Sequence, residues 1–264
     1  MNWENDIMHK TILAIAAHPD DIEFMMSGTL FLLKEAGHDI HYLNIANGSC
    51  GTASLGADRI AAIRGKEAKE AAFYLGAEHH ESFVNDIEIF YEKKLIMKLC
   101  AEIRRAEPDI ILTQYPWEYM EDHSNTSKLV VTAAFCRGLR NFPVEPAEKP
   151  TNNKITIYHA MPYGLTDPLR KPVVPDFFVE ISSVMDKKTK MLSFHKSQKE
   201  WLDVSQGFDS YLTAMADMCR EVGEMSGRFE YAEGWTRHLH LGFCDKDSDP
   251  LVDVLNEYVC TSGP

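Results

Sequence analysis

The residues with the clearest chemical potential stand directly after the first apolar strand expected in the chain, at positions 11–16. There the sequence reads Ala-His-Pro-Asp-Asp over positions 17–21. In open α/β sheets, ligand sites lie beyond the carboxyl ends of the strands. Because His18 and Asp21 are three residues apart at a turn, their side chains can converge on one metal ion, which leaves Asp20 free to handle protons. This spacing indicates a metal-dependent hydrolase.

A second polar cluster follows the apolar strand expected at 109–114. Its members are Glu118, Glu121, Asp122 and His123. If both strands end at one edge of a sheet, His123 completes a set of three ligands with His18 and Asp21. Three protein ligands and an open position are typical of a catalytic zinc site, where the ion lowers the pKa of a water molecule to about 7 and Asp20 takes its proton. The residues alone also allow a plainer interpretation, in which the His-Pro-Asp sequence is only a turn.

The elements around these residues alternate between strands and helices in the first half of the chain. Strands are expected at 11–16, 38–45 and 109–114, and helices at 27–36, 58–75 and 91–106. From about residue 141 the chain is rich in proline, with strands expected at 154–159 and 177–181 and helices at 183–196 and 210–224. Helices between apolar strands favour right-handed βαβ units. The sequence therefore predicts a three-layer α/β/α sandwich, with a Rossmann-like, mostly parallel sheet and a Pro-rich and helical C-terminal extension.

Composition narrows the class of partner. The 264 residues are 45% hydrophobic, enough for one domain with a sizeable core. The 27 Lys and Arg against 40 Asp and Glu give a formal charge of −13, which argues against nucleic acid or an anionic membrane as the main partner. No apolar run approaches the roughly 20 residues of a membrane span, and no signal-peptide pattern is expected. The six scattered cysteines, without a Cys-x-x-Cys pair, are typical of reduced thiols in a cytoplasmic protein.

The run at 17–21, followed by Ser-Gly-Thr at 27–29, resembles the signature of the PIG-L/LmbE-like family of zinc-dependent deacetylases. These enzymes remove acetyl groups from N-acetylglucosamine-type sugars and related amides. Further similarity follows in family order at 64–76, at Asp86, at 122–123 and at 195–198, where the sequence reads His-Lys-Ser-Gln. The resemblance implies one such domain over residues 1–264, with a core at about 10–140 and a C-terminal extension at about 141–264.

The resemblance also implies a metal centre and its proton handler. His18, Asp21 and His123 would be the ligands, Asp20 the general base, and Asp122 would orient a neighbouring group. The implied cofactor is Zn²⁺, although two histidines and a carboxylate also suit Fe²⁺, cobalt or manganese. The implied reaction is hydrolysis of an N-acyl group, in particular an N-acetyl group, with water on the metal as the nucleophile.

The same resemblance implies that Arg64, Asp86 and His195 contact the sugar. Without it, each has a plainer role: Arg64 lies on a solvated helix face, Asp86 in a turn and His195 near a helix end. The partner would be a small amino sugar or glycoconjugate, and the family likeness is compatible with a homo-oligomer.

Two further segments carry polar or aromatic side chains of interest. Positions 231–235 resemble an Ala-Glu-aromatic element of the family, which is expected at the substrate entrance or at an oligomer contact. Positions 78–81 read Glu-His-His-Glu, but adjacent residues of a strand point to opposite faces, which favours a structural or exposed role.

One position departs from the family pattern. The second motif usually reads His-x-Asp-His, and its first His helps to stabilise the tetrahedral intermediate. Met120 stands there in this chain, and a thioether cannot donate a proton. Either Glu121, Tyr119 or His195 takes over this task, or the chain is a metal-binding protein of the same fold with lost or altered hydrolase activity. A nucleotide-binding Rossmann enzyme would need a Gly-x-Gly-x-x-Gly turn after the first strand, which is absent.

Overall fold

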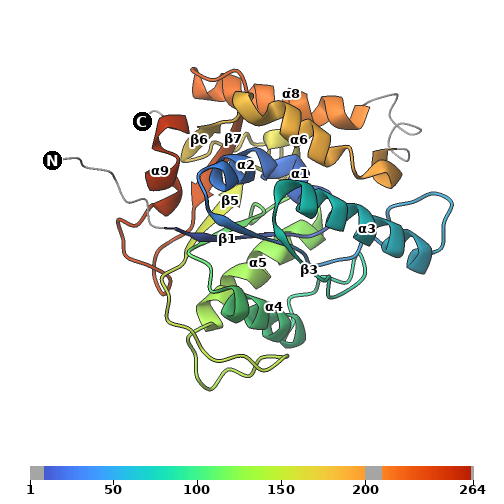
Figure 1. Ribbon diagram of the computed structural model, residues 1–264, viewed down its shortest axis with the longest axis vertical. Helices are drawn as coiled ribbons and strands as arrows, with labels where there is room; N and C mark the ends of the chain where they lie inside the picture. The colour runs from blue at the N-terminus through green and yellow to red at the C-terminus, as the bar shows by residue number, and fades with distance from the viewer. Residues whose placement is uncertain (1–8, 200–209, 263–264) are drawn as a thin grey trace.

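A computed structural model describes residues 9–199 and 210–262, and these form one mixed sheet with helices on both faces (Figure 1). The sheet has eight strands in the order β3-β2-β1-β4-β5-β7-β6-β8. The strands are β1 (Thr11–Ala16), β2 (Asp39–Asn44), β3 (Glu78–His80), β4 (Ile110–Thr113), β5 (Thr156–Ala160), β6 (Phe177–Glu180), β7 (Ala232–Arg237) and β8 (Val259–Thr261). The helices are α1 (Asp21–Met25), α2 (Ser27–Glu35), α3 (Ala57–Leu75), α4 (Lys93–Ala106), α5 (Glu121–Cys136), α6 (Met185–Leu192), α8 (Ser210–Ser226) and α9 (Pro250–Val254). Short 3₁₀ turns lie at Tyr163–Leu165, Ser182–Val184 and Asn256–Tyr258.

The three layers follow from the burial of the central strands on both faces. Helices α1, α2, α3, α6 and α8 lie on one face of the sheet, and α4 and α5 lie on the other (Figure 1). In β1, alternate residues belong to the two different cores, Ile12 and Ala14 to one and Leu13 and Ile15 to the other. A strand that is buried on both faces reads as a continuous apolar run, as the sequence does here. The expected α/β/α sandwich is confirmed.

The pairing of the strands changes along the chain. β3, β2, β1, β4 and β5 are parallel, whereas β7 is antiparallel to β5 and to β6, and β6 is antiparallel to β8. The sheet is therefore mostly parallel, as expected, with an antiparallel part that comes from the second half of the chain.

The order of the parallel strands creates the crevice in which the candidate residues lie. β1 has β2 on one side and β4 on the other. The connection after β1 leads to one side of the sheet and the connection after β4 leads to the other, so the strand order reverses between β1 and β4. Ligands of open α/β sheets bind at such points, outside the carboxyl ends of the strands. Residues 17–21 follow β1 and residues 114–123 follow β4, so both polar clusters come to this crevice.

The C-terminal part is joined to the core through β7. Glu233 accepts hydrogen bonds from the backbone N–H groups of Gly28 and Thr29, both at 2.8 Å, and from Lys188 Nζ at 2.7 Å. Trp235 is completely buried and its Nε1 donates to Thr29 Oγ1. Segment 231–235, expected at a substrate entrance or an oligomer contact, instead supplies an interior strand of the sheet, and that expectation is wrong.

Two expectations from composition can be compared with the structure. Among residues 9–199 and 210–262, no helix is both long and apolar enough to cross a membrane. The six cysteines are all free thiols.

Candidate metal and catalytic site

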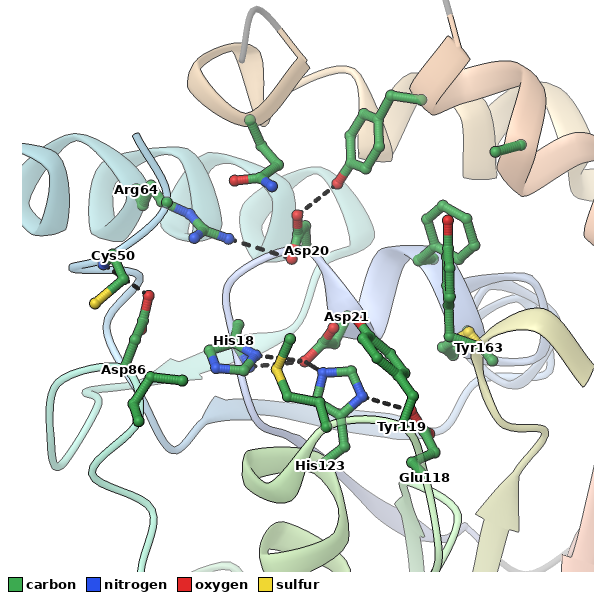
Figure 2. Close-up of a pocket in the computed structure, with 18 residues that line it drawn as sticks. His18, Asp20, Asp21, Cys50, Arg64, Asp86, Glu118, Tyr119, His123 and Tyr163 are labelled. Atoms are coloured by element: carbon green, nitrogen blue, oxygen red, sulfur yellow. Dashed lines mark hydrogen bonds and ion pairs between the residues drawn. The ribbon is translucent and has the colours of Figure 1, made fainter. Parts of the chain in front are cut away.

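Three side chains singled out by the sequence, His18, Asp21 and His123, meet at the carboxyl ends of β1 and β4 (Figure 2). His18 follows β1, Asp21 begins α1, and His123 lies in the first turn of α5. Asp21 Oδ2 is 3.4 Å from His18 Nδ1 and 3.4 Å from His123 Nε2. All three side chains line a cavity of about 420 Å³. The structure therefore brings the three expected ligands together on one side of a cavity.

In each histidine of this cluster, the ring nitrogen that faces away from Asp21 lies within hydrogen-bond distance of a carboxylate. His18 Nε2 lies 3.0 Å from Asp122 Oδ2, and His123 Nδ1 lies 2.6 Å from Glu118 Oε2. Both carboxylates are buried. A carboxylate in this position keeps a proton on the nitrogen that faces it, so when a metal ion displaces the second proton of the ring, the nitrogen that faces Asp21 is the one that presents a lone pair. Two lone pairs and one carboxylate oxygen are a donor set that fits Zn²⁺ or a similar transition metal.

The charges around the cluster favour a cation. Burial lowers the pKa of His18, but its hydrogen bonds with Asp122 and Asp21 raise it overall, to about 10. Burial also lowers the pKa of His123, and the negative charges of Asp21 and Glu118 raise it overall. Burial raises the pKa of Asp21, whereas His123 and the hydrogen bond from His18 lower it overall. Carboxylates that hold two imidazoles in their charged form would equally stabilise a divalent ion.

Asp20 lies beside the cluster and lines the same cavity (Figure 2). Its backbone has φ 108°, a conformation that costs a residue with a side chain of the order of 1–3 kcal/mol and that recurs at functional sites. Tyr211 Oη donates to Asp20 Oδ2 at 2.7 Å, and Arg64 Nη2 lies 3.3 Å from Oδ1. Burial raises the pKa of Asp20 and the charge of Arg64 lowers it, with a net increase. A carboxyl with a raised pKa is suited to both accepting and returning a proton.

Arg64 and Asp86, expected to contact the substrate, line the cavity but already have partners in the protein. The guanidinium of Arg64 is buried between Asp20 and the loop at 47–51, and it donates to the carbonyl of Pro19. A Cβ on Gly48, whose φ is +81°, would lie only 2.6 Å from Arg64 Cδ, so glycine allows this close approach.

Asp86 fixes the same loop from the other side. Its Oδ1 accepts from the backbone N–H of Gly48 at 2.7 Å and its Oδ2 from that of Cys50 at 2.9 Å. The main contacts of this carboxylate are therefore with the cavity wall.

His195, also expected to contact the substrate, occupies a different position. Its side chain is completely buried, does not line the cavity, and places Nε2 3.0 Å from Glu23 Oε1. The structure corrects the expectation of a direct contact, because His195 packs behind the wall of the cavity, where its charge acts on Asp20 through space.

The substitution at Met120 falls on the cavity itself, at the residue before α5. Of the three replacements considered, Glu121 is exposed and His195 is buried behind the wall, and neither lines the cavity. Tyr119 does line it, with its ring edge-on to the ring of His123 at 5.5 Å between centroids. Partial burial and the nearby acidic groups, Asp21 first, raise the pKa of Tyr119, so its hydroxyl stays protonated as a hydrogen-bond donor.

Aromatic side chains form another part of the wall. The ring of Tyr163 lies 5.7 Å from that of Tyr119 and 5.4 Å from that of Phe24, measured between centroids. These rings offer apolar faces to a ligand such as a sugar, whose C–H groups pack on aromatic surfaces.

Sequence reasoning missed several groups that hold the site together. Tyr211 comes from α8, far along the chain, and a tyrosine in an amphipathic helix gives no local signal of a role beyond packing. Gln114 accepts from the backbone N–H of Ala17 and donates to Asp21 Oδ2 at 3.2 Å. Its place directly after β4 was the available signal.

Comparisons with known proteins show which sequences and structures this chain resembles. A family model described as "GlcNAc-PI de-N-acetylase" matches residues 13–134. Diacetylchitobiose deacetylase from Thermococcus kodakarensis is 31% identical over 237 residues, covering 87% of this chain and 83% of that protein. A 4-oxalmesaconate hydratase from Pseudomonas putida is 25% identical over 244 residues, covering 85% and 88%. The structure of N,N′-diacetylchitobiose deacetylase from Pyrococcus horikoshii superposes with a TM-score of 0.73 and 26% identity, over 87% of this chain and 84% of that one.

Proposed function

Since this chain belongs to the PIG-L family, whose matching model is described as a GlcNAc-PI de-N-acetylase, we propose that it hydrolyses the N-acetyl group of an amino sugar or sugar conjugate. The observation that carries the proposal is the convergence of His18, Asp21 and His123 beside Asp20 in one cavity. The names of the relatives support a sugar as the substrate, since two of those compared are deacetylases of diacetylchitobiose.

The residues that would hold the metal are His18 through Nδ1, His123 through Nε2 and Asp21 through Oδ2. Asp122 and Glu118 orient the two imidazoles by the hydrogen bonds described above. When bound, a zinc ion, or another divalent transition metal such as Fe²⁺, supplies Lewis acidity that polarises a carbonyl and lowers the pKa of a water molecule to about 7.

Asp20 moves the proton in this proposal. As a carboxylate it accepts a proton from the attacking water, and as a carboxylic acid it returns that proton to the nitrogen of the leaving amine. Its raised pKa brings the two forms closer in energy near neutral pH. Arg64 and Tyr211 hold both oxygens, which keeps the carboxyl group directed at the cavity.

Tyr119 takes the place of the missing histidine in this proposal. The developing negative charge on the carbonyl oxygen needs a hydrogen-bond donor, and Met120 provides none. The protonated hydroxyl of Tyr119 belongs to a ring that contacts His123 and lines the cavity. It is therefore the best-placed neutral donor among the three groups considered.

The alternative is a metal-binding protein of this fold with lost or altered hydrolase activity. Met120 favours it, and the hydratase among the relatives is a precedent for a similar chain with a different reaction.

Metal content combined with an amine-release assay separates these functions. We expect about one cavity-bound zinc per chain and release of free amine from N-acetylglucosamine or N,N′-diacetylchitobiose. His123→Ala should lose both, whereas the matched variant His79→Ala, on a different element, should keep both. Asp20→Asn should retain the metal and lose turnover by at least about 10²-fold. Metal without amine release would support the alternative, a metal-binding protein with lost or altered hydrolase activity. Absence of metal from the cavity would refute the proposal.

A further inference from the structure

A second group of metal-ligand side chains lies at the edge of the sheet, outside the cavity. β3 is the edge strand, and its parallel pairing with β2 sets Glu78 opposite His41. Because strand residues two positions apart share a face, His80 lies on the same face as Glu78. His79 points to the other face, where its ring stacks on Tyr42. The expectation that the two adjacent histidines point to opposite faces is confirmed. On the face of Glu78 and His80, the neighbouring strand β2 adds a second histidine, His41.

The ligand atoms of this edge cluster, formed by His41, Glu78 and His80, all lie within 4.8 Å of one another. His41 Nδ1 is 2.9 Å from His80 Nε2 and 3.8 Å from Glu78 Oε2. Two nitrogen ligands at 2.0–2.1 Å from a tetrahedral ion lie about 3.4 Å apart. The two ring nitrogens would therefore have to move apart by about 0.5 Å to bind an ion in this geometry.

The buried histidine of the edge cluster is oriented by a carboxylate, as are the histidines in the cavity. His80 Nδ1 lies 2.8 Å from Glu102 Oε2, in α4, and Arg105 Nη1 is 3.0 Å from the same oxygen. In the neutral imidazole this contact places the proton on Nδ1, so Nε2 is the nitrogen that directs a lone pair towards His41.

We propose that His41, His80 and Glu78 form a second metal site, which binds a divalent transition ion of the zinc class. Two imidazoles and one carboxylate suit Zn²⁺, Ni²⁺ or Cu²⁺ better than Mg²⁺ or Ca²⁺, which prefer oxygen ligands alone. The Glu78 side chain is 67% exposed, so the site opens to solvent and exchanges its ion readily.

This site has a structural consequence. An ion bound there joins β2 to the three-residue edge strand β3, and through Glu102 it is linked to α4. An ion that binds only the folded chain shifts the unfolding equilibrium towards the native state. We therefore expect zinc to raise the melting temperature even when the cavity cluster is disabled.

Zinc titration of the full-length chain, after removal of metal with a chelator, tests the proposal. Calorimetry should detect two sites per chain in the wild type and one in His41→Ala. His79→Ala, the neighbouring histidine on the opposite face, should keep two. In the His123→Ala background one site should remain, and adding His41→Ala should remove it. Equal stoichiometry and affinity in wild type and His41→Ala would overturn the proposal.

Carboxylate variants give an independent test that does not depend on removing a histidine. Glu78→Gln changes an exposed side chain and should lower affinity at the edge site by more than about tenfold, whereas Glu81→Gln, which loses a surface ion pair with Lys69, should not. Glu102→Gln should weaken the same site by about 10- to 100-fold. No change in Glu78→Gln and Glu102→Gln would also overturn the proposal. Loss of metal in His41→Ala but not in His123→Ala would leave the edge site standing and refute the cavity assignment instead.

Discussion

The substitution Tyr211→Phe tests whether the protein sets the proton affinity of Asp20. The phenol donates to Asp20 Oδ2 at 2.7 Å, and both side chains are largely buried, so the hydrogen bond is shielded from bulk water. Phenylalanine keeps the ring that packs against Phe24 and removes only the donor. The variant should therefore fold as the wild type does.

The size of the effect follows from the charge on the acceptor. A hydrogen bond to a charged group contributes about 1.5–3 kcal/mol, and we take the low end of this range for the estimate. At 1.36 kcal/mol per factor of ten, the ratio of protonated to ionised Asp20 should rise about tenfold. The donated hydrogen bond lowers the pKa of Asp20, so its removal raises that pKa further. Because the ionised form is the base, the acid limb of kcat/KM moves to higher pH.

The assay is amine release from an N-acetylated amino sugar across the acid limb of the profile. On that limb Tyr211→Phe should be about tenfold slower than the wild type, and the two rates should approach each other above it. Tyr163→Phe is the matched control, because it also removes a hydroxyl from the cavity wall but not one that contacts Asp20. Superimposable profiles for Tyr211→Phe and wild type would refute Asp20 as the base whose ionisation sets the limb.

Four further substitutions test other parts of the structure. Tyr119→Phe should lower kcat by about 10²- to 10³-fold with metal content unchanged, and an unaltered kcat would exclude it as the oxyanion donor. Glu118→Gln should weaken zinc binding about 10- to 100-fold in competition with a chelator; unchanged affinity would show that it does not orient the histidine. Asp86→Ala leaves two N–H groups of the loop at 48–50 without their acceptor, so urea unfolding should show a loss of about 1–3 kcal/mol. Lys188→Met removes the cation that pairs with the buried carboxylate of Glu233 and should cost about 3–5 kcal/mol in the same assay, and a loss below 1 kcal/mol would contradict a buried ion pair.

The parts of the site that could be predicted from the sequence are those set by strand ends. An apolar run followed by His-Pro-Asp-Asp, and a second apolar run followed by an acidic cluster and His123, place ligand-type residues at one edge of a parallel sheet. The order of β1 and β4 in the sheet then brings His18 and His123 together. These predictions depend on local sequence pattern and on a general rule of sheet topology, and neither requires the partner of an individual buried side chain to be known.

The parts that could not be predicted depend on contacts across the chain. Tyr211 reaches Asp20 from 191 positions away, and Glu233 reaches Gly28 from 205 positions away. Neither contact leaves a periodic signal, because the partner of a single buried polar atom is decided by packing. The antiparallel strand β7 was missed for the same reason: its burial comes from β5 and β6 beside it.

The predictable and the unpredictable contacts also differ in what they do in the site: the first position the metal-ligand candidates, and the second add groups around Asp20 and in the cavity wall. The family model matches residues 13–134, which contain the three metal-ligand candidates, their orienting carboxylates and Asp20. Arg64, which contacts Asp20, also lies in the matched part, whereas Tyr211, the hydrogen-bond donor to Asp20, and Tyr163, in the cavity wall, come from the chain beyond that match. If the metal chemistry belongs to the matched part, then exchanging residues 135–264 between relatives should change the substrate and the pH profile more than the metal affinity. The second half of the chain is therefore where we expect the substrate preference of this protein to be set.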